Sequence, residues 1–182
     1  MKYVKYIIII LIIITLLFIS YSFYIKNKKI KIEEFQSIQY RAYGGFMSYF
    51  DTFLLPNIII NKNYEVILKP SNDLIKYDDY IFTITKQELE EIINSLNKNN
   101  FFLQNSHIVK NCYDAGTIKL EVRTNRLNKE VELYCYNNKN IDNIIKIIYN
   151  IIDKDKKVSN YYNSLMKKAK EDTDINKGVY NE

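Results

Sequence analysis

The chain has 182 residues, with 26 Lys and Arg against 21 Asp and Glu, and a formal net charge of +5. Its length allows one domain of ordinary size, and its 47% hydrophobic residues exclude a disordered chain. One His and two Cys exclude a zinc finger or any other site built from several such ligands. The basic excess raises the question of whether the chain binds nucleic acid.

Residues 7–25 form an uncharged, strongly apolar run near the N-terminus. A helix rising about 1.5 Å per residue makes this run roughly 28 Å long, close to the ~30 Å hydrocarbon core of a bilayer. The run is longer than the apolar part of a cleavable signal peptide. We therefore predict an uncleaved single-pass membrane anchor in preference to a buried core helix. The predicted anchor includes the apolar residues Ile7, Leu11, Leu16, Phe18 and Ile25.

Lysines flank the apolar run on both sides and leave two orientations open. Lys2 and Lys5 precede the run, and four lysines in residues 26–31 follow it. The larger number on the C-terminal side places the domain in the cytoplasm under the positive-inside rule. A short N-terminus with lysines before an apolar run is instead typical of an export signal. We favour the second orientation, which displays the domain outside the cytoplasmic membrane.

The same lysines account for the basic excess. Six lysines and no acidic residue lie in residues 1–31, so residues 32–182 carry 20 basic and 21 acidic side chains, a net charge of −1. Nucleic-acid binding needs a concentrated basic surface. We therefore predict that the partners are the lipid bilayer and a protein, with no nucleic acid, metal or small-molecule cofactor.

The rest of the chain predicts a single small α+β domain of antiparallel strands in the order ββ(β)αββα, with helices packed on one face. We divide the chain into an anchor with its lysine flanks (residues 1–31), the globular domain (residues 32–158) and a C-terminal part (residues 159–182). The C-terminal part is predicted to be a helix at residues 160–170 and a mobile polar tail from Glu171.

The first half of the domain predicts strands followed by a helix. The strands are expected at residues 36–43, 53–60 and 64–69, with a turn at residues 61–63 where Asn tolerates left-handed geometry, and a polar loop is expected before residues 80–84. Pro56 lacks an N–H group, so its strand lies at an edge or carries a bulge. Thr85 and Glu88 have the spacing of a capping box, which predicts a helix start. The apolar residues Leu89, Ile92, Ile93 and Leu96 then recur at helical spacing.

The second half predicts a hairpin and a covering helix. Residues 118–123 and 131–135 alternate apolar and charged or aromatic side chains. A turn at residues 125–128 would pair Val122 with Val131, Leu120 with Leu133 and Ile118 with Cys135. Asn140 is the expected cap of the next helix, whose isoleucines at 141, 144, 145, 148 and 152 would cover the hairpin.

Candidate chemical groups are few. Cys112 and Cys135 predict a disulfide if the domain lies outside the cytoplasm and two thiols if it lies inside. His107 lies near Cys112, and loop carboxylates such as Asp114 offer acid–base groups. The spacings match no calcium loop, phosphate-binding loop or nucleophile elbow. We therefore predict that the protein is not an enzyme and has no catalytic residues.

Several short segments resemble a family of small bacterial exported domains, the emfourin-like inhibitors of protealysin. The resemblance covers residues 36–152. It rests on the segment from Tyr40 to Phe46, which contains Gly44, Gly45 and Phe46, and on Cys112-Tyr113-Asp114 before a closing hairpin and helix. The resemblance implies that Gly44, Gly45, Phe46 and Asp114 belong to binding loops. Met47 stands where such domains often have another Gly.

These observations predict a membrane-anchored, extracytoplasmic, non-enzymatic protein-binding domain. The resemblance implies a narrower version, in which the domain inhibits a metallopeptidase. Two other classes stay open: a membrane adaptor that faces the cytoplasm, and an enzyme that uses loop carboxylates or the Cys112 thiol. The enzyme class requires His107, Cys112 and Asp114 to converge in one pocket.

Overall fold

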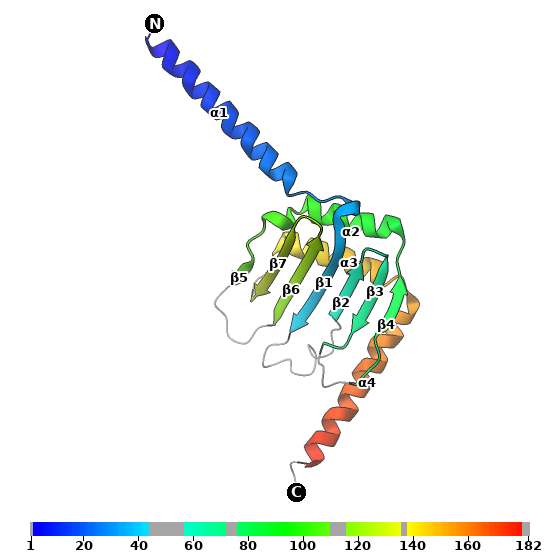
Figure 1. Ribbon diagram of the computed structural model, residues 1–182. Coiled ribbons are helices and arrows are strands. Elements are labelled where there is room, and N and C mark those ends of the chain that lie inside the picture. Colours follow the sequence, from blue (N-terminus) through cyan, green and yellow to red (C-terminus); the bar gives the residue numbers. More distant parts are fainter. Residues whose placement is uncertain (1, 44–56, 72–75, 110–115, 136–137, 180–182) are drawn as a thin grey trace.

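The computed structural model of the chain describes residues 2–43, 57–71, 76–109, 116–135 and 138–179. The described elements combine one sheet with four α-helices, so the predicted α+β class is confirmed (Figure 1). The helices are α1 (Lys2–Asn27), α2 (Lys86–Lys98), α3 (Lys139–Ile152) and α4 (Lys156–Val179). The strands are β1 (Phe35–Tyr43), β2 (Asn57–Asn61), β3 (Glu65–Lys69), β4 (Tyr80–Thr83), β5 (His107–Val109), β6 (Thr117–Thr124) and β7 (Asn128–Tyr134).

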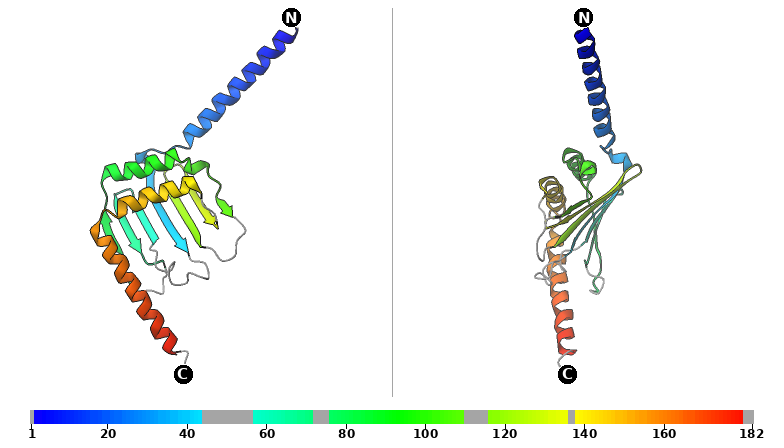
Figure 2. Two further views of the ribbon diagram at one scale, coloured as in Figure 1. Left: turned by 180° about the vertical axis from the view of Figure 1, so that it is seen from behind. Right: turned by 90° about the vertical axis from the view of Figure 1, so that its left-hand side faces the viewer.

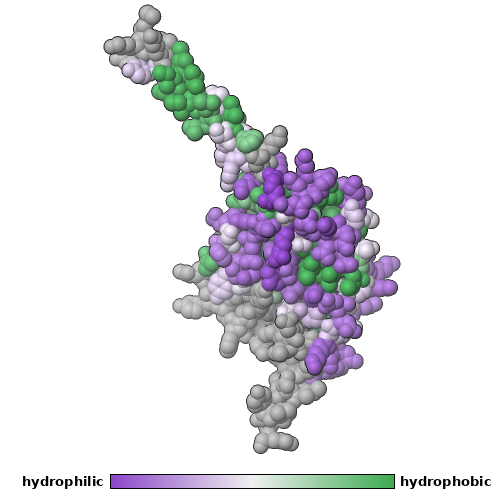
Figure 3. Space-filling model, viewed as in Figure 1, coloured by the Kyte–Doolittle hydropathy of each residue, from purple (hydrophilic) through white to green (hydrophobic). Residues whose placement is uncertain are grey.

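Helix α1 contains the predicted apolar run and projects away from the sheet (Figure 1). The 19 residues Tyr6–Tyr24 have a mean hydropathy of 2.7, and none of this span is buried in the protein. By length and composition, the span is sufficient to cross a membrane. The apolar surface of α1 contrasts with the mostly hydrophilic surface of the domain (Figure 3).

The seven strands form one mixed sheet in the order β4-β3-β2-β1-β6-β7-β5. Strand β1 lies at the centre and pairs with β2 and β6. The neighbouring strands pair antiparallel except β5, which runs parallel to β7. The prediction of antiparallel strands alone is therefore wrong at this edge. A strand of three residues, His107–Val109, is too short to produce a detectable alternation along the sequence.

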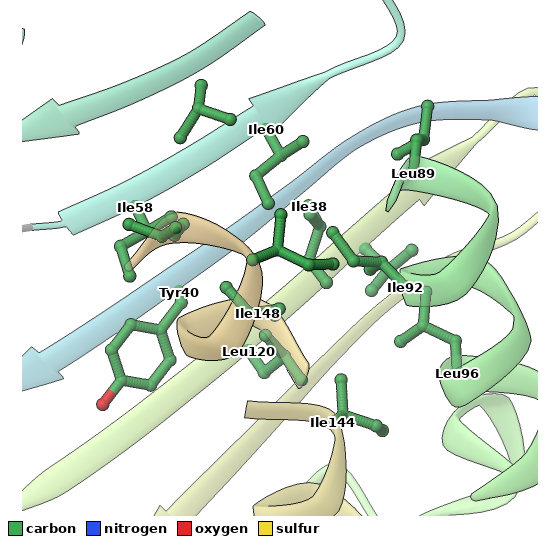
Figure 4. Packing of buried hydrophobic residues seen from close by; sticks show 14 of the residues in the cluster. Ile38, Tyr40, Ile58, Ile60, Leu89, Ile92, Leu96, Leu120, Ile144 and Ile148 are labelled. Atoms are coloured by element: carbon green, nitrogen blue, oxygen red, sulfur yellow. The ribbon is translucent and has the colours of Figure 1, made fainter. Parts of the chain in front are cut away.

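Helices α2 and α3 cover one face of the sheet, as predicted (Figure 2). The helix positions Leu89, Ile92, Ile93 and Leu96 are all buried, which confirms the predicted apolar face of α2. Figure 4 shows α2 and α3 side chains meeting Ile38, Ile58 and Leu120 from the sheet. The domain is thus a two-layer structure around one hydrophobic core.

The predicted capping box at the start of α2 is confirmed. The Glu88 N–H donates to Thr85 Oγ1 at 3.2 Å, and the Thr85 N–H donates to Glu88 Oε2 at 2.9 Å. The second carboxylate oxygen of Glu88 accepts from Lys154 Nζ at 2.9 Å. The cap of α2 therefore also ties the helix to the segment between α3 and α4.

The predicted hairpin of β2 and β3 is present, although Pro56 and residues 53–55 lie outside the described residues. The left-handed residue of its turn is Tyr64, with φ 68°, and not one of the asparagines. Tyr64 keeps this conformation because its ring packs against the core and its carbonyl accepts from the Ile84 N–H at 2.9 Å.

The hairpin of β6 and β7 has a different register from the predicted one. Leu120 lies opposite Val131, and Ile118 opposite Leu133, so the pairing is shifted by two residues. The turn explains the shift, because the Thr124 hydroxyl donates to the Leu127 carbonyl and accepts from the Leu127 N–H, both at 2.6 Å. A shift of two residues keeps the same side chains on the core face. Cys135 lies beyond the strand, with φ 58°.

Two predictions about the C-terminal helices are also corrected. The cap of α3 is Asn138, whose Oδ1 accepts from the N–H groups of Asn140 and Ile141, so the predicted cap Asn140 lies inside the helix. Helix α4 runs from Lys156 to Val179, so the tail predicted from Glu171 begins as helix. The first half of α4 docks through buried residues at helical spacing, Val158, Tyr161 and Leu165.

Candidate functional site

The face of the sheet opposite α2 and α3 is the candidate functional site, and we call it the open face. The view in Figure 1 looks onto this face, and the view from behind in Figure 2 shows α2 and α3 on the other side. Because side chains alternate along a strand, β1 directs Gln39 and Arg41 to the open face while Ile38 and Tyr40 are buried in the core. The open face has a charged half and an apolar half.

The charged half lies over β1, β6 and β7, with Arg41 at its centre. An Arg41 Nη2 atom lies 3.5 Å from Glu121 Oε2 and 3.6 Å from Glu130 Oε2. The Lys119 ammonium lies 3.7 Å from Glu130 and 3.5 Å from Glu132. Two cations therefore contact three carboxylates on three neighbouring strands. Partly exposed ion pairs of this kind contribute little stability, so they define the charge pattern of the surface more than they hold the fold.

The outer margin of this half continues the pattern. His107 Nδ1, on β5, lies 3.2 Å from Glu132 Oε2. Arg123 Nε donates to Glu121 Oε1 at 2.6 Å. The imidazole of His107 is 70% exposed and beside a carboxylate. His107 is thus part of a surface charge network rather than of an enclosed pocket.

The apolar half lies over β2, β3 and β4. The register aligns Ile59 with Ile67 and Ile67 with Ile81, so three isoleucines form a row across the strands. Ile81, on the edge strand, is 55% exposed, and the other two are half-buried. In Figure 3 a hydrophobic patch interrupts the hydrophilic surface on the side where Figure 1 places these strands.

One row across the sheet joins both halves. Glu130 lies opposite Glu121, which lies opposite Gln39, and Gln39 lies opposite Ile59. The row therefore passes from carboxylates through an amide to the isoleucines. A surface with an apolar strip bordered by charged groups is suited to recognise a protein surface of complementary pattern.

The centre of the open face contains two buried polar atoms without a hydrogen-bond partner among the described residues, Arg41 Nε and Asn57 Oδ1. The first is a donor and the second an acceptor. A buried polar group that lacks a partner costs about 1–3 kcal/mol. The centre of the open face therefore has hydrogen-bonding capacity that the described residues leave unused.

A cluster of one buried and two partly buried tyrosines lies on the other side of β1. The rings of Tyr40 and Tyr149 meet edge to face at 5.7 Å. Burial raises the pKa of the Tyr149 phenol, and the nearby Tyr40 adds to this effect. Burial likewise raises the pKa of the Tyr162 phenol. These phenols stay neutral at physiological pH, so they pack between the sheet and the C-terminal helices without a charge.

A second concave surface lies between α2 and α3. It is a groove of about 470 Å³. Asparagines dominate its lining and bond to one another, with Asn143 Nδ2 donating to Asn99 Oδ1 at 3.2 Å and Asn99 Nδ2 donating to the Ser95 carbonyl at 2.9 Å. Because these polar groups are already paired, the groove is a weaker candidate than the open face.

The structure tests few of the predicted site residues. Gly44, Gly45, Phe46, Cys112 and Asp114 lie outside the described residues. The convergence required for an enzyme with Cys112 and Asp114 is therefore untested, and His107 is known only as the partner of Glu132. Two other loop carboxylates, Asp51 and Asp73, also lie outside the described residues, and a third, Asp79, pairs with Lys69 at 3.3 Å.

Cys135 is disulfide-bonded. The only other cysteine of the sequence is Cys112. In the described part of the chain, no group of three or more His, Cys, Asp or Glu side chains is placed to hold a metal ion.

Sequence reasoning missed the open face as a site. The alternation of Lys119, Glu121 and Arg123 was recognised as the outer side of a strand. The feature that indicates a site is the position of three strands with charged side chains next to one another. This arrangement depends on the pairing of β1 with β6.

Comparison with known proteins returns no match to a protein-family model and no match to a curated protein sequence.

Proposed function

We propose that the protein is a membrane-anchored, non-enzymatic domain displayed outside the cytoplasmic membrane, and that it binds a protein partner through the open face. The observation that carries this proposal is the row of exposed and half-buried isoleucines, Ile59, Ile67 and Ile81, beside a network of ion pairs. The proposal needs no cofactor and no catalytic group.

Two features support the extracytoplasmic side. Helix α1 has the length and composition of a membrane span and begins near the N-terminus, as the signal-anchor interpretation requires. Cys135 is disulfide-bonded, and disulfides persist in oxidising compartments and are rare in the cytoplasm. We propose that its partner is Cys112.

The pattern of the open face supports a protein as the partner. Ile81 exposes more than half of its surface on an edge strand, and an apolar strip with a polar margin is the usual anatomy of a protein interface. The charged half carries both signs, through Arg41 and Lys119 against Glu121, Glu130 and Glu132. Such mixed charge selects the orientation of a partner and does not attract a polyanion.

The orientation is tested by a reporter fused to the C-terminus, after Glu182. We expect activity from a reporter that works only outside the cytoplasm and none from one that works only inside. The reverse result overturns the extracytoplasmic proposal and supports a cytoplasm-facing adaptor. In the first case, blocking free thiols before and after reduction also shows whether Cys112 and Cys135 are bonded in cells.

The binding surface is tested by photo-crosslinking of the full-length protein in its own membrane. A photoreactive residue at Ile81 should yield a protein adduct, whereas one at the exposed Gln87, on α2 and therefore on the other side of the sheet, is the matched control. Ile59→Lys should abolish the adduct from position 81. Equal adducts from both positions, or an adduct that Ile59→Lys leaves intact, would argue against the open face.

The narrower proposal, inhibition of a metallopeptidase, rests on the resemblance of Gly44, Gly45, Phe46 and Asp114 to binding loops. Its test is the activity of thermolysin-like peptidases in the presence of the detergent-solubilised full chain. Full peptidase activity at a large molar excess of the protein removes this version and leaves the broader proposal standing.

A further inference from the structure

The segment between the anchor and the sheet is bound to the domain and is not a free tether. Helix α1 ends at Asn27, and two residues, Lys28 and Lys29, separate it from Ile30. The side chain of Ile30 is 3% exposed and belongs to the hydrophobic core. The core of the domain thus begins three residues after the helix ends.

The side chain of Asn97, in the last turn of α2, holds the backbone of Ile30 at both polar groups. The Ile30 N–H donates to Asn97 Oδ1 at 2.9 Å, and Asn97 Nδ2 donates to the Ile30 carbonyl at 2.8 Å. One amide side chain therefore satisfies a donor and an acceptor of the segment at once.

Arg126, from the turn between β6 and β7, provides a second attachment. Its Nη2 donates to the Lys29 carbonyl at 2.7 Å. The same guanidinium binds the Glu34 carboxylate through Nε and Nη2, at 3.1 and 3.2 Å. Glu34 also accepts from the Lys31 N–H at 3.1 Å. A bidentate, charge-assisted pair of this kind restricts geometry as well as contributing energy.

These attachments limit the distance between the domain and the bilayer. The apolar span ends at Tyr24, and the helix continues to Asn27 at about 1.5 Å per residue. Three further steps of at most about 3.5 Å reach Ile30, so Ile30 lies within about 15 Å of the hydrocarbon edge. Because the head-group layer is about 5–8 Å deep on each side, the surface around Ile30 lies within about one Debye length of the head groups.

This surface is basic although the domain as a whole is near neutral. We call Lys28, Lys29, Lys31 and Lys98 the basic collar. Lys29, Lys31 and Lys98 are exposed, and Lys98 follows Asn97 in the last turn of α2. Lys129 lies beside the collar, where burial and the nearby Lys28 lower its pKa. The adjacent Glu34 is already paired with Arg126, so residues 28–34 carry three lysines against one exposed carboxylate, Glu33.

We propose that the docked segment holds the domain against the bilayer and that the basic collar binds the phosphates of acidic phospholipid head groups. This inference rests on the proposed function, because it requires α1 to lie in a membrane. In Figure 1 the strands extend away from the end of α1, so contact at the collar leaves the open face accessible along its length.

The test uses full-length protein in vesicles that carry a nitroxide on a fraction of the lipid head groups. The chain has no Trp, so a single introduced Trp reports one position by its quenching. Asn125→Trp places the probe on the exposed turn beside Arg126, and Val109→Trp places it on β5 as the distal control. The vesicles contain phosphatidylcholine alone or with phosphatidylglycerol.

We expect stronger quenching at position 125 than at position 109 and a further increase with phosphatidylglycerol. The increase should be lost in 1 M salt, where the Debye length is about 3 Å, and when all four collar lysines are changed to Gln. Asn97→Ala should weaken quenching at position 125, whereas Asn94→Ala, one turn earlier and exposed on the same helix, should not.

Equal quenching at both positions overturns the docked geometry. Lipid binding by the collar is overturned if quenching at position 125 is unchanged by phosphatidylglycerol, by salt and by the lysine substitutions. Flotation separates these failures from failure of the proposed function. Protein that does not float with the vesicles lacks the membrane anchor, whereas protein that floats without selective quenching refutes only this inference.

Discussion

The turn between β6 and β7 offers the sharpest test of how this fold sets its register. Thr124 is 7% exposed, and its hydroxyl makes three hydrogen bonds within the turn. It donates to the Leu127 carbonyl at 2.6 Å and accepts from the N–H groups of Leu127 and Arg126 at 2.6 and 3.2 Å. Thr124→Val preserves the shape of the side chain and removes all three bonds.

The expected loss follows from these bonds. At about 0.5–1.5 kcal/mol net for each hydrogen bond, the three contribute roughly 1.5–4.5 kcal/mol. The valine buries a methyl group in place of the hydroxyl, which stabilises the folded protein by about 1 kcal/mol and offsets part of this loss. We therefore expect Thr124→Val to lower the free energy of unfolding by about 2 kcal/mol, the middle of a range of about 0.5–3.5 kcal/mol. Thr124→Ser keeps the hydroxyl and loses one methyl group, which costs about 1 kcal/mol.

The assay is urea unfolding of the full-length protein in detergent, followed by circular dichroism of the sheet. With a slope near 2 kcal/mol per molar urea, the midpoint should fall by about 1 M for Thr124→Val and by about 0.5 M for Thr124→Ser. If the two variants unfold at the same midpoint, the hydroxyl does not stabilise the turn, and the explanation given above for the register is wrong.

Three further predictions concern the core, the capping box and α4. Leu120→Ala, at a fully buried position, should cost about 2–5 kcal/mol, whereas Ile81→Ala on the open face should change the unfolding midpoint little. The pKa of the Glu88 carboxyl is lowered, chiefly by its hydrogen bonds with Lys154 and the Thr85 N–H. Its contribution to the stability of the folded protein is therefore complete above the pKa of the unfolded chain, and it is lost as the pH falls through the lower pKa of the folded state. The unfolding temperature, measured as a function of pH, should fall in this acid range. Glu88→Gln should make the fall smaller, and Glu90→Gln should leave it unchanged. Tyr161→Phe removes the hydroxyl that donates to a β3 carbonyl at 3.1 Å. It should lower the free energy of unfolding by about 1 kcal/mol, and it should accelerate amide exchange in α4 more than in the sheet.

Local features of the fold were predictable because their partners lie close together in the chain. The capping box needs only Thr85 and Glu88, three residues apart, and the structure confirms it. The apolar face of α2 and the alternation of β1 are likewise properties of single segments. The cap of α3 was misplaced by two residues because Asn138 and Asn140 offer the same side chain, and only the backbone geometry distinguishes them.

Features that join distant segments were not predictable in the same way. The register of β6 and β7 differs by two residues from the predicted one, and hydrophobic alternation cannot detect a shift that leaves every side chain on its original face. The open face also depends on β1 pairing with both β2 and β6, which places the isoleucines and the Arg41 network side by side.

The sequence by itself determined where charge and hydrophobicity lie along the chain. The +5 net charge arises from six lysines around one apolar run, and the remaining domain carries a net charge of −1. Only the tertiary structure decided what surrounds those lysines, because Asn97 and Arg126 reach the segment after α1 from positions 67 and 97 residues away. Composition records how many charges a chain has, whereas folding decides which of them share a surface.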